Sequence, residues 1–173
     1  ASVMVVGITP LERRWYPQPY SPTNQSHAVA GLADSRVVIN DVIDQILDHY
    51  GLPRSRIALA GFSAGGVMAI NVAAHSKEEL AGAVCHAGAV LEPNKLPKCK
   101  YPEMPIVLTH CQDDDVFSWD ERYLPMSEAL NKQGYRTECI TNTWGGHRVD
   151  RNDIIESAKI LLPRLGVEDE SIN

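Results

Sequence analysis

Residues 61–65 read Gly61-Phe62-Ser63-Ala64-Gly65, and this pentapeptide decides the expected fold. The apolar run 57–60 precedes it, and an apolar stretch with helical character follows it over residues 67–74. A serine between a strand and a helix occupies a sharp turn that strains its backbone, so its neighbours must lack bulk. Gly61 and Gly65 are expected to supply that room. The pattern therefore predicts a serine exposed at the carboxyl end of a buried strand.

Short apolar segments alternate with helix-periodic ones along the rest of the chain. Strands are expected at residues 3–6, 57–60, 82–85, 106–109 and 137–140. Short strands that are nearly all apolar are typical of a parallel sheet covered by helices on both faces. The sequence therefore predicts an α/β fold, a three-layer sandwich around a mostly parallel sheet.

Helices are expected between these strands. One runs from residue 34 to residue 50 and ends at Gly51 and Pro53. Its apolar residues are interpreted as one core-facing stripe: Val38, Ile39, Val42, Ile43, Ile46, Leu47 and Tyr50. Further helices are expected over about 121–133, with Pro125 in the first turn, and over about 153–165. The longest irregular stretch, residues 15–35, is expected to border the functional site.

A serine hydroxyl is a weak nucleophile near neutral pH and needs a general base that a third group orients. In a sheet of this kind the chain order is serine, acid, histidine. Of the six histidines, His147 fits best because it follows the strand-like residues 136–140. His110 is expected to shape the acid loop instead. An ordinary loop histidine remains the simpler interpretation of His147.

The acid is expected after the strand at residues 106–109, where Asp113, Asp114 and Asp115 stand in a row. A solvated turn or a weak cation site is the simpler interpretation of such a run. The run lacks the interleaved spacing, central glycine and closing glutamate of an EF-hand loop. A metal site that adds His110 and Cys111 has no recognisable ligand spacing. One of the three aspartates is therefore favoured as the acid of a triad.

Three blocks, residues 59–66, 109–116 and 144–147, carry a family resemblance. They are similar to the phospholipase/carboxylesterase family of serine hydrolases, which includes acyl-protein thioesterases and lysophospholipase-like proteins. Residues 8–17 and 50–57 also resemble that family, so the similarity covers nearly the whole chain. The resemblance implies a single α/β-hydrolase domain over residues 1–173. In the family the acid follows a His-Gly pair by a fixed step, which makes Asp114 the counterpart here.

The resemblance implies an enzyme that cleaves short- to medium-chain carboxylic esters, with thioesters and lysophospholipids as further substrates. Ser63 would be the nucleophile, His147 the base, Asp114 the acid, and the Ala64 backbone N–H an oxyanion donor. No cofactor or metal is expected. Three aromatic residues are candidates for substrate contacts: Trp15, Tyr16 and Phe62.

The chain departs from the family pattern at several positions. Ala64 replaces a frequent glutamine, Cys111 a usual glycine and Phe117 a frequent proline, but none of these changes removes a catalytic group. The family's N-terminal strand with its His-Gly-rich loop, which gives the second oxyanion donor, has no counterpart. The chain is therefore expected to be N-terminally truncated or a minimal form, with residues 7–10 as the substitute donor. Loss of one donor costs on the order of 10² to 10³ in rate.

Composition restricts the possible partners and location of the chain. The chain has 173 residues, 44% of them hydrophobic, and a net charge of −6 without a basic stripe. These values argue against nucleic-acid partners, and no apolar run suits stable membrane insertion. The four cysteines form no Cys-x-x-Cys pair, so a cytoplasmic protein with reduced thiols is expected. A homo-oligomer is left open.

Two other functions remain open from the sequence. A non-catalytic, hydrolase-like module for binding or oligomerisation would follow from an incomplete oxyanion hole and an uncovered sheet edge. The intact set of serine, aspartate and histidine argues against it. A peptidase or acyltransferase would use the same triad, so the triad does not separate these activities from an esterase.

Overall fold

The computed structural model describes residues 3–10, 14–16 and 25–167, with only the backbone for residues 25–28. In this part of the chain four strands form one parallel sheet in the order β1-β2-β3-β4. Their bounds are Ala58–Phe62, Gly82–His86, Pro105–Cys111 and Arg136–Asn142. Parallel neighbours need long crossover connections, which here run over the faces of the sheet. The predicted α/β class with a parallel sheet is confirmed.

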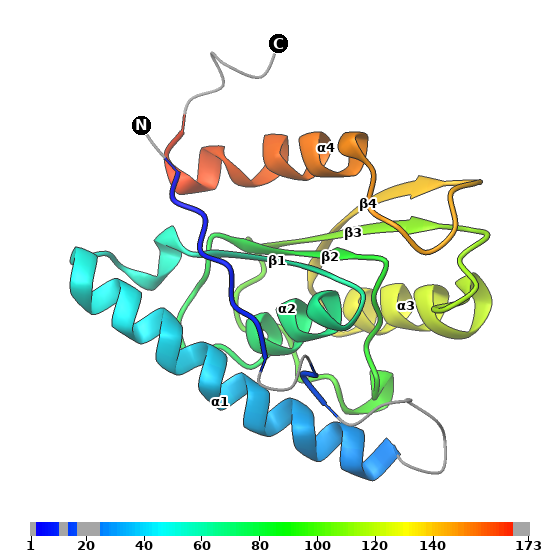
Figure 1. Ribbon diagram of the computed structural model, residues 1–173, viewed down its shortest axis with the longest axis horizontal. Helices are drawn as coiled ribbons and strands as arrows, with labels where there is room; N and C mark the ends of the chain where they lie inside the picture. Colours follow the sequence, from blue (N-terminus) through cyan, green and yellow to red (C-terminus); the bar gives the residue numbers. More distant parts are fainter. Residues whose placement is uncertain (1–2, 11–13, 17–24, 168–173) are drawn as a thin grey trace.

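Helices lie on both faces of the sheet (Figure 1). One face carries α4 (Arg151–Leu161), and the other carries α2 (Ala64–Ala74) and α3 (Leu124–Lys132). The long helix α1 (Gln25–Tyr50) lies outside α2 on that second face. Short helical turns complete the described part: η2 (Arg54–Arg56), η3 (Pro93–Lys95), the π-helical η4 (Trp119–Tyr123) and η5 (Pro163–Leu165). The arrangement is the predicted three-layer sandwich.

The core follows from burial on both faces of the central strands. Every residue of β2 and β3 is buried, whereas β1 and β4 at the two edges are partly exposed. The cluster between the sheet and the helices α2 and α3 includes Ile70, Leu108 and Leu130. A smaller cluster under α4 includes Val84 and Leu161. Central strands covered on both faces need apolar side chains in both directions, which explains their continuous apolar sequence.

The strand expected at residues 3–6 is absent, and that prediction is wrong. This segment forms no sheet pairing in the described structure, and its Val5 side chain is 90% exposed. A strand requires hydrogen bonds to a neighbour, and β1 has a described neighbour only on its β2 side. Apolar β-branched composition alone therefore gives no strand here.

Helix α1 differs from its prediction at its start and in its stripe. It begins at Gln25, so part of the stretch expected to be irregular is helical. Residues 17–24 of that stretch lie outside the described residues. Ile39 and Ile43 are buried, but Val38 and Tyr50 are more than half exposed. The expected stripe was too wide because successive helical residues turn by about 100°, and a single face contacts α2.

The other helices follow their predictions with shifted ends. Helix α2 starts at Ala64, directly after the serine, and Pro125 lies in the first turn of α3 as expected. Helix α4 ends at Leu161, before Pro163, and the chain continues as η5. Proline has no backbone N–H to donate and cannot continue a regular helix, which accounts for the earlier end.

We expect Leu130→Ala to destabilise the protein by about 3 kcal/mol, since Leu130 is 0% exposed and its loss leaves a cavity. Leu124→Ala is the matched control, because Leu124 begins the same helix and is 37% exposed. Its cost should stay below about 1 kcal/mol. Urea unfolding of both variants measures the difference, and equal losses would contradict the assigned core.

Candidate active site

Ser63 occupies the sharp turn between β1 and α2. Its φ is 55° and its ψ is −119°, a conformation that a non-glycine residue adopts at a cost of about 1–3 kcal/mol. Two backbone hydrogen bonds hold it: the Ser63 N–H donates to His86 O at 2.8 Å, and Ser63 O accepts from Val67 N at 3.1 Å. The turn is thereby fixed to strand β2 on one side and to the first turn of α2 on the other.

The two flanking glycines have different roles. A Cβ on Gly61 would lie 2.2 Å from the carbonyl C and O of Gly65 and 2.7 Å from the N of Gly66. A Cβ on Gly65 would meet nothing within 4 Å. The expectation that both glycines supply room is thus correct for Gly61 and wrong for Gly65. The sequence pattern did not reveal that the crowding is one-sided.

The parallel register brings three loops to one edge of the sheet. Phe62 lies opposite His86, and Cys111 lies opposite Asn142, so the segments that follow β1, β3 and β4 emerge together. These segments carry Ser63, Asp114 and His147. Carboxyl ends of parallel strands are the usual place for sites in α/β folds.

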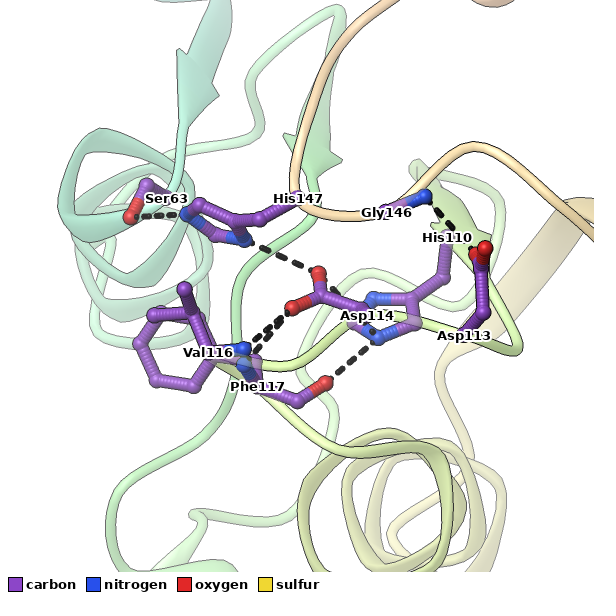
Figure 2. A network of polar contacts seen from close by, with 8 residues as sticks. All are labelled: Ser63, His110, Asp113, Asp114, Val116, Phe117, Gly146 and His147. Carbon is purple, nitrogen blue, oxygen red and sulfur yellow. Dashed lines mark hydrogen bonds and ion pairs between the residues drawn. The ribbon is translucent and has the colours of Figure 1, made fainter.

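The three side chains form a continuous hydrogen-bonded series (Figure 2). His147 Nε2 lies 2.9 Å from Ser63 Oγ, and His147 Nδ1 lies 2.9 Å from Asp114 Oδ2. A carboxylate can only accept, so Nδ1 carries the proton and Nε2 is free to accept from the serine hydroxyl. The imidazole is thereby held in the tautomer that a general base requires.

Asp114 is fixed by its own loop. Its side chain is 0% exposed, and Oδ1 accepts hydrogen bonds from the N–H groups of Val116 and Phe117, both at 2.8 Å. The Nε2 of His110 donates to Phe117 O at 2.7 Å, and this bond closes the loop from β3. His110 therefore has the loop-shaping position expected for it. The second carboxylate oxygen, Oδ2, lies 2.9 Å from His147 Nδ1 and 3.6 Å from His110 Nε2.

Sequence reasoning missed two kinds of contact around His147: ring contacts with its imidazole and hydrogen bonds to the preceding glycines. The Phe62 and Phe117 rings lie 4.8 Å and 5.8 Å, between centroids, from the imidazole. The Asp113 carboxylate accepts from the N–H groups of Gly145 and Gly146, at 3.1 Å and 2.7 Å. The adjacent Gly145 and Gly146 were the sequence signal for the Asp113 contact, because a loop segment without side chains needs hydrogen bonds from another part of the chain to hold it.

The remaining candidates lie in different surroundings. The Ala64 N–H is in the first turn of α2, where backbone N–H groups have no intrahelical acceptor. Phe62 is 44% exposed beside His147, whereas Tyr16 is only 3% exposed and belongs to a core cluster. Trp15 packs against that same cluster. Tyr16 therefore contributes to packing, and Phe62 is the aromatic residue beside the imidazole.

Burial changes the protonation of two histidines near the site. It lowers the pKa of His110 and of His86 below the ordinary 6.5. The Nδ1 of His86 is 2.8 Å from Thr109 Oγ1 on the neighbouring strand. By contrast, hydrogen bonds from Gly146 and Gly145 lower the pKa of exposed Asp113 below 3.8. His110 and His86 are therefore neutral structural groups at neutral pH.

A cavity of about 270 Å³ lies between α1, α2 and residues 90–96. Its lining includes Leu32, Val67, Leu91 and Leu96. Val67 is one helical turn after Ser63, and the Val67 N–H donates to the Ser63 carbonyl.

In the described part of the chain, no three His, Cys, Asp or Glu side chains are grouped to hold a metal ion. The same residues include no helix long and apolar enough to cross a membrane.

Comparison with known protein families identifies the chain. The family model described as Phospholipase/Carboxylesterase matches residues 8–159. The chain belongs to this family. The resemblance in residues 59–66, 109–116 and 144–147 is thus confirmed at the level of the family.

Relatives in this phospholipase/carboxylesterase family are distant. Acyl-protein thioesterase 1 of Neurospora crassa is 28% identical over 141 residues, which make up 79% of this chain and 57% of that protein. Acyl-protein thioesterase 1 homolog 2 of Dictyostelium discoideum is 30% identical over 96 residues, 53% of this chain and 42% of that protein. The chain spans about half the length of these relatives.

Solved structures share the fold. Arabidopsis thaliana SOBER1 superposes with a TM-score of 0.71 at 19% identity, over 88% of this chain and 74% of that one. Esterase PE8 gives a TM-score of 0.75 at 20% identity, over 88% and 71%. The described sheet therefore corresponds to a part of a larger α/β-hydrolase sheet, and no described strand corresponds to that fold's N-terminal strands.

We expect Gly61→Ala to destabilise the fold by at least about 3 kcal/mol, because the added methyl group meets backbone atoms that cannot move independently. Gly65→Ala should be neutral or stabilising by up to about 1 kcal/mol, since its Cβ enters open space in a helix. Thermal unfolding of both variants checks this. A tolerated Gly61→Ala would contradict the turn geometry.

We expect the free energy of unfolding to decrease as the pH falls below about 6.5. The pKa values of His110 and His86 are lowered in the folded state, so below 6.5 the unfolded chain binds protons that the folded chain does not. This stability is fully present above 6.5 and is lost as the pH falls through the lowered values. Asp113, whose pKa is lowered from 3.8, contributes in a separate, more acidic window.

Urea unfolding between about pH 7.5 and pH 5 measures this slope. His110→Gln keeps an N–H donor near Phe117 O but has no group that titrates, so its slope should be shallower than that of the wild type. A wild-type free energy that stays constant or rises on acidification would contradict the prediction.

Proposed function

We propose that this chain is a serine hydrolase that cleaves carboxylic esters through an acyl-enzyme. The observation that carries the proposal is the series Ser63, His147 and Asp114, joined by two 2.9 Å hydrogen bonds. Membership of the phospholipase/carboxylesterase family supports the same chemistry. The strained turn at Ser63 supports it further, because strain of this kind is concentrated at functional positions.

The reaction would proceed in two steps. His147 Nε2 accepts the Ser63 proton while Oγ attacks the ester carbonyl carbon, and Asp114 stabilises the imidazolium that forms. The imidazolium then gives its proton to the leaving alcohol as the tetrahedral intermediate collapses to the acyl-enzyme. Water next attacks the acyl carbon with His147 again as base, which releases the acid and restores Ser63.

The Ala64 N–H is proposed as one donor to the oxyanion. Residues 7–10 are proposed to give the second. Ile8 packs against the same core cluster as Ala64, and this shared packing is the support for the proposal. A single donor would leave a reaction slower by on the order of 10² to 10³.

The proposed substrates are esters of short to medium acyl chains. A cavity of about 270 Å³ reaches Val67, one turn from Ser63. It is lined by apolar residues such as Leu32 and Leu96 together with polar ones such as Arg36, Asn71 and Lys95. Its apolar lining and its volume support a small acyl group. Two relatives are named acyl-protein thioesterases, which adds thioesters to the proposed class. Attack on a thioester uses the same groups, with a thiol in place of the leaving alcohol.

The alternative is a non-catalytic hydrolase-like module for binding or oligomerisation. The position of β1 at one edge of the described sheet favours it, because an uncovered edge offers backbone groups to another strand. Such a module has no need of an ordered series of serine, histidine and aspartate. The ester hydrolase is therefore preferred.

Hydrolysis of p-nitrophenyl esters from acetate to palmitate tests the proposal. We expect turnover by the wild type that falls by at least about 10³-fold in Ser63→Ala and is greatest for short and medium chains. Ser55→Ala, at an exposed serine of η2, is the matched control and should keep full activity. If the folded protein shows no Ser63-dependent turnover on any ester, the ester-hydrolase proposal is wrong and the non-catalytic module is favoured.

A further inference from the structure

The loop that carries His147 has little packing to hold it. No residue from 141 to 150 is buried, and Trp144 is 77% exposed. Gly145 and Gly146, which precede the histidine, have no side chains and adopt φ values of 153° and 67°. Two consecutive glycines allow many backbone conformations in the absence of a constraint. A general base needs its nitrogen within hydrogen-bond reach of the nucleophile. The Phe62 and Phe117 rings contact the imidazole, but they do not constrain the main chain of the glycine pair, which needs a further contact.

The Asp113 carboxylate is placed to do this. Its Oδ1 accepts from the Gly146 N–H at 2.7 Å and its Oδ2 from the Gly145 N–H at 3.1 Å; Figure 2 shows the Gly146 bond. Beyond the histidine, the Arg148 N–H donates to Gly146 O at 3.0 Å and closes the turn. The two N–H groups lower the pKa of Asp113, which is therefore ionised at neutral pH. Hydrogen bonds to an ionised acceptor are the stronger kind.

We propose that Asp113 is a positioning residue that holds the backbone next to His147 in register with Ser63, a role that rests on the proposed ester hydrolase. Asp113 and Asp114 are consecutive, yet they fix different parts of the loop that carries His147. Asp114 binds the imidazole Nδ1, and Asp113 binds the peptide groups that lead into the residue. The loop after β3 thus constrains the loop after β4 at both its side chain and its main chain.

The effect should appear in kcat rather than in KM, because the contact orients a base and touches no substrate. Asp113→Asn keeps the shape of the side chain, but its amide presents one acceptor oxygen and an NH₂ group that faces a backbone N–H. A displacement of about 1 Å at a catalytic group can cost on the order of 10²-fold, so a partly freed loop should cost about tenfold.

The experiment compares Asp113→Asn with Asp115→Asn, which removes the same charge from an exposed carboxylate two positions later. We expect kcat on the best p-nitrophenyl ester to fall about tenfold in Asp113→Asn, with KM within about twofold, and to be unchanged in Asp115→Asn. In a His147→Ala background, Asp113→Asn should have no further effect on the residual rate. A residue that only supports folding would act in both backgrounds.

Two NMR measurements test the contact without using activity. In Asp113→Asn, the low-field resonance of the His147 Nδ1 proton should broaden and the Gly146 amide should exchange faster, whereas Asp115→Asn should leave both unchanged. Wild-type kcat in Asp113→Asn, an equal loss in Asp115→Asn, or an undiminished effect in the His147→Ala background would overturn the proposal. If the wild type lacks Ser63-dependent turnover, the proposed function fails by itself. The NMR comparison then decides on Asp113, and unchanged resonances reject it.

Discussion

The close approach of Gly61 to the backbone of Gly65 and Gly66 is the contact on which the site depends. A side chain at position 61 would occupy the place of the Gly65 carbonyl. Because Gly61 has no side chain, the Gly65 carbonyl can occupy that place, and the chain turns from β1 into α2 at Ser63, whose φ is 55°. The hydrogen bond from Ser63 N to His86 O then attaches the turn to β2, so the sheet fixes the position of Ser63.

The same acid loop shows how environment separates neighbouring groups of one chemical type. Asp114 is buried and accepts three hydrogen bonds, two from backbone N–H groups and one from His147. Asp113 is exposed and accepts from two backbone N–H groups of another loop. His110, under both, is buried and donates to Phe117 O. Residue type alone therefore does not determine the role of these side chains, which depends on where each one lies in the loop after β3.

The sequence predicted those parts of the structure that local chemistry determines. The apolar strands β2 and β3, the turn at Ser63 and the helix end at Gly51 are readable from residue type and period, whereas the last helix was expected to continue past Pro163 and does not. The segment 3–6 was misjudged because strand formation depends on a neighbour, which composition does not reveal. For the site, chain order and family pattern pointed to Ser63, Asp114 and His147, which the structure brings within hydrogen-bond distance. The hydrogen bonds between Asp113 and the two glycines depend on tertiary structure. In the sequence, the adjacent Gly145 and Gly146 are the one sign of them.

The hydrogen-bonded series of Ser63, His147 and Asp114 also joins the two outer strands of the described sheet. Ser63 follows β1 and His147 follows β4, and 84 residues of chain separate them. Edge strands open more readily than central ones, and local opening requires less free energy than global unfolding. Fraying at either edge would therefore separate His147 from Ser63 while β2 and β3 stay paired. In rising denaturant, the hydrogen bond between Ser63 and His147 should therefore be lost before the core unfolds.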